Sequence, residues 1–142
     1  MNYLDYLTSL PVIKFKKNWN GKLLEPTRYF TTIRQQYPMK YWKGREYRIE
    51  LVNKSPFLAR MIAMQEQTLG EVKDTWLRID TGLPPDEARK EFEHMYANQC
   101  ANAGITLDQL PVTLMMFERI SPERWTQEVE QGIIQLQQPT TP

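Results

Sequence analysis

Residues 28–34, Arg28-Tyr-Phe-Thr-Thr-Ile-Arg34, are rich in β-branched and aromatic residues and carry an arginine at each end. Such residues fit a pleated, half-buried surface, so the stretch predicts a β-strand. Because side chains alternate along a strand, Arg28, Thr32 and Arg34 fall on one side. A hydroxyl between two guanidinium groups can bind a phosphate or a base edge, since arginine offers paired donors. This strand is the best candidate for a binding site; the alternative is that this side only faces water.

Four further segments predict strands around this one. Residues 12–16 and 45–52 alternate apolar and charged side chains, which is typical of half-buried strands. Residues 57–65 and 112–117 are apolar on nearly every position, as strands in the centre of a sheet are. The segments between them hold Gly, Pro and Asn, including a predicted loop at residues 18–26.

Helices are predicted before, between and after these strands. Residues 2–10 show apolar spacing of three and four behind Asn2, a suitable N-cap. Thr68 and Glu71 match the capping box at a helix start, with Val72, Trp76 and Ile79 as the apolar stripe of a helix that ends near residue 80. A second helix opens at residues 84–87, where prolines precede two acids.

A last helix opens at Ser121-Pro122. Its apolar stripe, Trp125, Val129, Ile133 and Leu136, is expected to dock on the chain's own core; a homodimer through this helix is the alternative. The tail at residues 137–142 is expected to be frayed.

The element order and the composition predict a single α+β domain over residues 1–142. No stretch approaches eighteen apolar residues, so we expect no membrane span. The single cysteine, Cys100, excludes an intrachain disulfide. Met1 to Pro11 carries an acid and no base, unlike a signal peptide, so we expect a cytoplasmic protein.

Positive charge is concentrated in one half of the sequence. Residues 12–60 hold twelve Lys or Arg and three acids, whereas residues 61–142 hold six bases and thirteen acids. Aromatic residues run through the basic half, and cations with flat rings suit phosphates and bases. This combination indicates nucleic acid; the alternative is a solvated basic sheet face balanced by acidic helices.

Other chemistries find little support in the sequence. His94 is the only histidine and is predicted to face solvent, so neither a metal site nor a Ser-His-Asp or Cys-His device is expected. The six glycines form no phosphate-binding loop, so no nucleotide cofactor is expected. Asp80, in the turn Ile79-Asp-Thr-Gly82, is the second site candidate, although such a residue is more often a turn former.

The element order resembles the ASCH superfamily of small PUA-like β-barrels, over residues 11–120. Three segments carry the resemblance: the basic strand at 28–34, the segment Lys43-Gly-Arg-Glu-Tyr-Arg-Ile-Glu-Leu51, and the helix at 82–96 before the last apolar strand. The resemblance implies a β-barrel of about five strands with helices packed at its side. The C-terminal helix, at about residues 121–137, would be an addition.

The family resemblance also implies RNA or a modified nucleoside as ligand. Some members are amidohydrolases of acetylated cytidine that use a Lys, a Thr and a Glu. The Thr corresponds to Thr32, while Tyr29 stands at the Lys position and Thr81, beside Asp80, at the Glu position. Lys22 lies too far upstream to restore the family's spacing. Binding is therefore expected to be retained better than catalysis, for which Thr32 and Asp80 are the remaining candidates.

We thus expect an RNA- or nucleotide-binding module with a basic, aromatic-lined cleft that takes a single strand or a modified nucleoside. An amidohydrolase and a protein-interaction module are the alternatives. The predicted ligand-binding residues are Arg28, Tyr29, Thr32, Arg34, Trp42, Lys43, Arg45, Arg48 and Asp80.

Overall fold

The computed structural model describes residues 1–16, 21–24 and 27–136. Within these residues, five strands form one mixed sheet in the order β1-β3-β4-β5-β2. The strands are β1 (Val12–Phe15), β2 (Tyr29–Gln35), β3 (Glu46–Leu51), β4 (Phe57–Thr68) and β5 (Pro111–Ile120). The predicted tail at 137–142, and the predicted loop at 18–26 except residues 21–24, lie outside the described residues.

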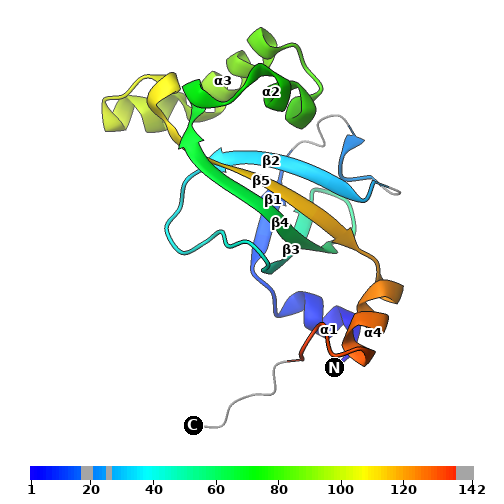
Figure 1. Ribbon diagram of the computed structural model, residues 1–142. Coiled ribbons are helices and arrows are strands. Elements are labelled where there is room, and N and C mark those ends of the chain that lie inside the picture. Colours follow the sequence, from blue (N-terminus) through cyan, green and yellow to red (C-terminus); the bar gives the residue numbers. More distant parts are fainter. Residues whose placement is uncertain (17–20, 25–26, 137–142) are drawn as a thin grey trace.

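In the described part of the chain, four α-helices sit at two ends of this sheet (Figure 1). They are α1 (Tyr3–Thr8), α2 (Asp74–Thr81), α3 (Pro85–Ala103) and α4 (Pro122–Glu130). The helices α2 and α3 lie at one end, and α1 and α4 lie together at the other (Figure 1). Two short 3-10 helices, η2 (Leu69–Glu71) and η3 (Leu107–Gln109), connect the long strands to the α2–α3 end. The predicted α+β class with about five strands is confirmed.

The sheet is open, and its two edge strands are β1 and β2. Side chains bridge the gap between these edges: an Arg34 Nη2 donates to the Lys14 carbonyl oxygen at 2.6 Å, and the rings of Phe15 and Phe30 meet edge to face at 6.2 Å. The interior strands are β3, β4 and β5; the continuous apolar sequences of β4 and β5 predicted their position, whereas β3 alternates. The sheet is therefore curled like a barrel that stays open between β1 and β2. Side chains hold these two edges together, and we call this line of contact the seam.

Three apolar clusters stabilise this arrangement. One fills the inside of the curled sheet around Tyr47 and Phe117. A second lies between the sheet and the α2–α3 pair around Leu77 and Phe92. The third joins α1 to α4, where Trp125 packs against Tyr6. Strand β2 is consequently buried on both faces from Phe30 to Ile33, even though it is an edge strand.

Several predicted helix features need correction. The capping box at Thr68 and Glu71 forms, but it starts η2, and α2 begins only at Asp74. The apolar stripe of α2 was misplaced: Ile79 is exposed, whereas Asp80 is buried on the face beside Leu77.

The α4 region also differs from the prediction. Helix α4 ends at Glu130, so the helical stripe does not continue to Ile133, which is exposed. Trp125 and Val129 pack on α1 within the chain, as expected, and a homodimer through α4 stays a prediction. Within the described ranges, no helix combines the length and apolar character that crossing a bilayer needs.

Tyr6, in the α1–α4 cluster, should make the fold sensitive to alkali. Burial, with Glu46 nearby, raises the pKa of Tyr6 to about 12. The folded protein holds the Tyr6 proton more tightly than the unfolded chain does, so Tyr6 stabilises the fold at pH values below the unfolded pKa of about 10. This contribution is lost as pH rises from about 10 towards 12. We expect the free energy of unfolding, measured by urea titration, to fall more steeply over pH 9.5–11.5 in the wild type than in Tyr6→Phe. Equal slopes would contradict this assignment.

Candidate functional site

A lysine and an aspartate that are 58 residues apart in sequence meet at the free edge of β2. The Lys22 Nζ lies 2.8 Å from the Asp80 Oδ1, with side chains only 7% and 1% exposed. The same ammonium donates to the Thr31 carbonyl oxygen at 2.7 Å and to the Asp80 carbonyl oxygen at 3.1 Å. The Thr31 hydroxyl donates to the Asp80 Oδ1 at 2.8 Å. We call Lys22, Thr31 and Asp80 the Lys22 network.

The fold places these three groups for separate local reasons. Thr31 lies on an edge strand, so its carbonyl oxygen is open to Lys22 rather than to another strand. Asp80 lies in the last turn of α2, which ends at Gly82 in the left-handed region (φ 73°). A carboxylate at a helix C-terminus opposes the helix dipole, and the Lys22 ammonium offsets this by binding both the carboxylate and the terminal carbonyl oxygen.

The electrostatics of Lys22 are set by burial. Burial lowers the pKa of Lys22, while Asp80 opposes the shift and Arg34 adds to it. These three oxygen acceptors match the three donors of an ammonium group, which is how a buried lysine is satisfied. Buried titratable groups with displaced pKa values that border a pocket are candidates for binding or catalysis.

Such a pocket opens beside the network, on the face of β2 that meets α2. Its volume is about 300 Å³, and its lining comprises Lys22, Thr27, Tyr29, Phe30, Thr31, Ile79 and Met116. We call it the edge pocket. Lys22 and Thr31 give it a polar wall, and Tyr29 and Ile79, both about half exposed, give it an apolar rim. This combination of a few polar groups with apolar walls, at this volume, suits a small planar ligand.

The predicted residues of β2 divide between this pocket and the seam. Tyr29 lines the edge pocket, and the exposed Arg28 guanidinium lies 5.3 Å from its ring centroid and 3.3 Å from the Glu118 carboxylate. Thr32 is buried on the inner side, where its hydroxyl accepts from the Arg34 Nε at 3.2 Å. Arg34 faces the seam, where its guanidinium lies 4.6 Å from the Phe15 ring centroid.

Two tyrosines, Tyr41 and Tyr96, lie near Arg34 at the seam. Burial raises the pKa of Tyr41, and Arg34 opposes the shift through its charge and a hydrogen bond. Burial also raises the pKa of Tyr96, whose shift includes contributions from Arg34, Tyr37 and Asp80. Arg34 is thus fixed by β1 and by rings, and its role in the described structure is to hold the seam.

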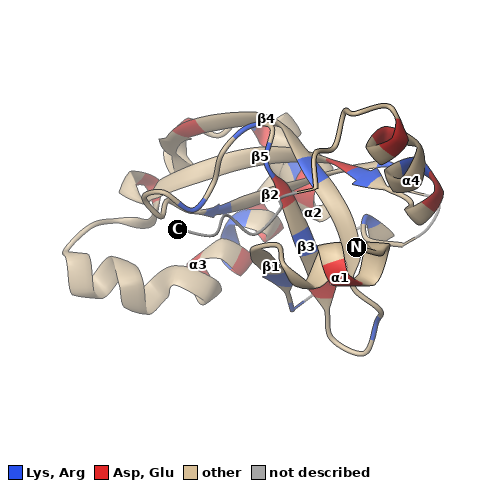
Figure 2. Ribbon diagram, turned by 90° about the horizontal axis from the view of Figure 1, so that it is seen from below, with Lys and Arg blue, Asp and Glu red and all other residues tan. Residues whose placement is uncertain are grey.

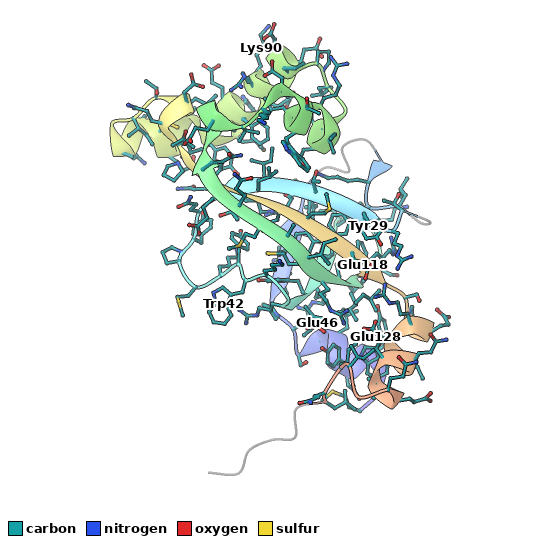
Figure 3. All side chains as sticks on the ribbon, in the orientation of Figure 1. Tyr29, Trp42, Glu46, Lys90, Glu118 and Glu128 are labelled. Carbon is teal, nitrogen blue, oxygen red and sulfur yellow. The ribbon has the colours of Figure 1, made fainter. Side chains whose placement is uncertain are left out.

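The remaining predicted cations and Trp42 lie elsewhere. Trp42 and Lys43 are exposed in the loop before β3, with the Arg45 guanidinium 5.1 Å from the Trp42 ring centroid. Arg48 is bound to Glu50 at 3.0 Å and to the Thr8 carbonyl oxygen, at the end of α1, at 3.0 Å. Trp42 and Tyr29 point away from opposite sides of the sheet (Figure 3). The nine predicted residues therefore do not share one cleft.

Charge is also more evenly mixed than the sequence indicated. Lys and Arg occur over several strands and loops with Asp and Glu among them (Figure 2). Arg28 is paired with Glu118, and Arg60 is paired with Glu46 and Glu128. Within the described ranges, no three acidic, histidine or cysteine side chains are grouped as metal ligands would be.

Sequence reasoning missed Lys22 and Thr31 as site residues. Spacing along the strand selected Thr32, but the hydroxyl that meets Asp80 is that of Thr31. Lys22 lies too far along the sequence from the strand for spacing to select it, yet its ammonium lies in the network. The ASCH resemblance implies a catalytic lysine, and this is the one signal in the sequence that could have led to Lys22.

Two solved structures have the same fold. An ASCH domain from Lactobacillus crispatus JV V101 matches with a TM-score of 0.61 and 10% identity, over 81% of this chain and 82% of that chain. A protein from Enterococcus faecalis V583, described by the family model DUF984, matches with a TM-score of 0.61 and 15% identity, over 96% of this chain and 94% of that chain. No family model matches the sequence, and no curated protein does. The chain therefore has an ASCH-like, PUA-like fold.

Proposed function

We propose that this PUA-like module binds one unstacked base of RNA, or a modified nucleoside, in the edge pocket. The observation that carries the proposal is the pocket itself: about 300 Å³, with the Lys22 network on one wall and Tyr29 on its rim. The resemblance to ASCH domains, which implies RNA or modified nucleosides, supports the same ligand class. Because a base is exposed in this way only in a single strand or after flipping, an intact duplex is disfavoured.

The residues around the pocket suit the separate parts of a nucleotide. Tyr29 offers a ring for stacking, since it is 49% exposed despite its place on a strand. Arg28 keeps 61% of its side chain exposed while paired with Glu118, so its guanidinium is accessible to a phosphate. Thr31 and Lys22 are among the residues that line the pocket, and the polar edge of a base would lie against them.

Replacement of Tyr29 by alanine should weaken RNA binding about tenfold, because stacking of one base on a ring contributes on the order of 1–3 kcal/mol. Fluorescence anisotropy with a labelled 12-nucleotide single-stranded RNA measures the change, at one fixed salt concentration. Leu4→Ala, which removes an exposed apolar side chain from α1 at the other end of the molecule, is the matched control.

Two results would contradict the proposal. One is equal affinity of Tyr29→Ala, Leu4→Ala and the wild type for this RNA. The other is displacement by heparin as effective as displacement by RNA, together with no preference among base compositions, which would show that only charge is recognised.

Hydrolysis of an amide on an acetylated pyrimidine nucleoside is the second candidate function. The observation that favours it is the Lys22 network, which supplies a lysine, a threonine and an acid together, as the family's hydrolases do. Asp80 accepts the Thr31 hydroxyl hydrogen bond and is placed to take its proton, and Lys22 is the adjacent cation. Incubation with acetylated cytidine and an assay for cytidine tests this; no turnover at high protein concentration leaves binding alone.

A further inference from the structure

The loop between β2 and β3, residues 36–45, presents large apolar side chains to solvent. Tyr37, Met39 and Trp42 are 51%, 74% and 48% exposed. In Figure 3 Trp42 points outward on the side of the molecule away from Tyr29, which lines the edge pocket. Exposed apolar side chains that gather on one short segment indicate an interaction surface, whereas isolated ones need no explanation.

The tip of this loop has a strained backbone that packing does not explain. Lys40 N–H donates to the Tyr37 carbonyl oxygen at 3.4 Å, which closes a turn with Pro38 and Met39 at its centre. Met39 has φ +65°, in the left-handed region, and glycine or asparagine usually occupies this turn position. Met39 is 74% exposed, so burial of its side chain does not offset this strain. Strain of this kind is concentrated at functional positions.

Cations lie against the rings of the same loop. The Lys40 Nζ is 5.2 Å from the Tyr37 ring centroid, and the Arg45 guanidinium is 5.1 Å from that of Trp42. Residues 36–45 contain three cations and no acid, and the Glu46 that follows is bound to Arg60. A ring paired with a cation is a good stacking partner for a base, and the cations attract the phosphates on either side of it.

We propose that this loop is a second contact for a single-stranded nucleic acid, separate from the edge pocket, so that the preferred ligand is an oligonucleotide rather than a free nucleoside. This inference rests on the proposed function of the pocket. Tyr29 begins β2 and Tyr37 follows its end, so at about 3.3 Å per strand residue the two contacts are separated by roughly 25 Å. A mononucleotide cannot span that distance.

The chemistry of the loop favours a nucleic acid over an anionic membrane. Membrane-binding segments bury a continuous apolar face, whereas here Lys40 and Arg45 lie against the rings themselves. Flat rings that alternate with cations instead match the repeat of bases and phosphates along a strand.

The test compares five variants, Tyr29→Ala among them, on two ligands, a 12-nucleotide single-stranded RNA and a mononucleotide. We expect Trp42→Ala to weaken binding of the RNA about tenfold, the effect of one stacked base, and to leave mononucleotide binding unchanged. Lys43→Ala should reduce the slope of log affinity against log salt by about one, because it removes one phosphate contact. Lys90→Ala, an exposed lysine on α3 at the far end of the molecule, is the matched control and should leave that slope unchanged.

Met39→Gly separates a role in binding from a role in folding. Glycine adopts a positive φ without strain, so the melting temperature should not fall, yet RNA binding should weaken because an exposed contact is lost. A variant with wild-type RNA affinity would argue that Met39 contacts nothing.

The outcomes distinguish this proposal from the function of the pocket. Wild-type RNA affinity in Trp42→Ala, with weak binding in Tyr29→Ala, would overturn the loop proposal and leave the pocket. Weak binding in Trp42→Ala alone would support the loop and overturn the pocket. Binding to phosphatidylcholine vesicles with 30% phosphatidylserine that depends on Trp42, without RNA binding, would overturn the loop proposal in favour of a membrane surface.

Discussion

Replacement of Lys22 by methionine is expected to lower the free energy of unfolding by about 3–5 kcal/mol, the usual effect of removing one partner from a buried ion pair. The reason is that the Asp80 carboxylate, only 1% exposed, would lose the ammonium that lies 2.8 Å away and keep only the Thr31 hydroxyl. Urea unfolding at pH 7, with the wild type in parallel, measures this change.

A second substitution identifies the cause of that loss. In Lys22→Met/Asp80→Asn the buried carboxylate is also removed, so much of the lost stability should return, because an unpaired buried charge is worse than none. Lys54→Met, which removes an exposed lysine, should have a free energy of unfolding within about 0.5 kcal/mol of the wild type. A Lys22→Met protein that is as stable as Lys54→Met would contradict the network.

Replacement of Arg60 by methionine should destabilise the α4 end of the molecule by about 3 kcal/mol. The Arg60 guanidinium donates to the Glu128 Oε1 at 3.1 Å and to the Glu46 Oε1 at 3.2 Å, so it joins α4 to β3 and β4. Both carboxylates are largely buried, and Figure 3 shows Glu46 and Glu128 at the same end of the sheet.

A double-mutant cycle with Glu128→Gln isolates this pair. In Glu128→Gln, Arg60 keeps Glu46 and Arg124 keeps Glu118, so the single change at Glu128 should have a smaller effect than the change at Arg60. Additive effects of Arg60→Met and Glu128→Gln would show that the two side chains do not interact. Arg78→Met, at an exposed position on α2, controls for the loss of an arginine and should leave stability nearly unchanged.

The sequence was most informative where a local pattern decides the structure. Alternation located the strands to within a few residues, and the apolar runs identified β4 and β5 as central, because burial on both faces requires apolar residues throughout. Asn2 and Ser121 cap their helices as predicted, since each side chain accepts a backbone N–H within its own turn. The parallel pairing of β1 with β3 had no such signal, because it depends on how the whole chain is connected.

The site depended on contacts that no short stretch of sequence encodes. Lys22 lies in a loop and resembles any surface lysine until folding brings it to Asp80. The face of α2 was misjudged for a related reason: Asp80 is buried because a distant lysine neutralises it, whereas hydropathy alone places it in solvent. The basic half of the sequence likewise did not remain a basic face, since residues such as Glu118 and Glu128 pair with its arginines.

The most direct test of the account is an amide chemical-shift map recorded while a single-stranded oligonucleotide is added to the labelled protein. Ligand binding as proposed predicts the largest shifts at residues 29–31 and at Ile79, which line the edge pocket, and a second group at residues 37–45. Shifts confined to other parts of the sheet, or a uniform weak response that disappears in moderate salt, would contradict base binding in the edge pocket.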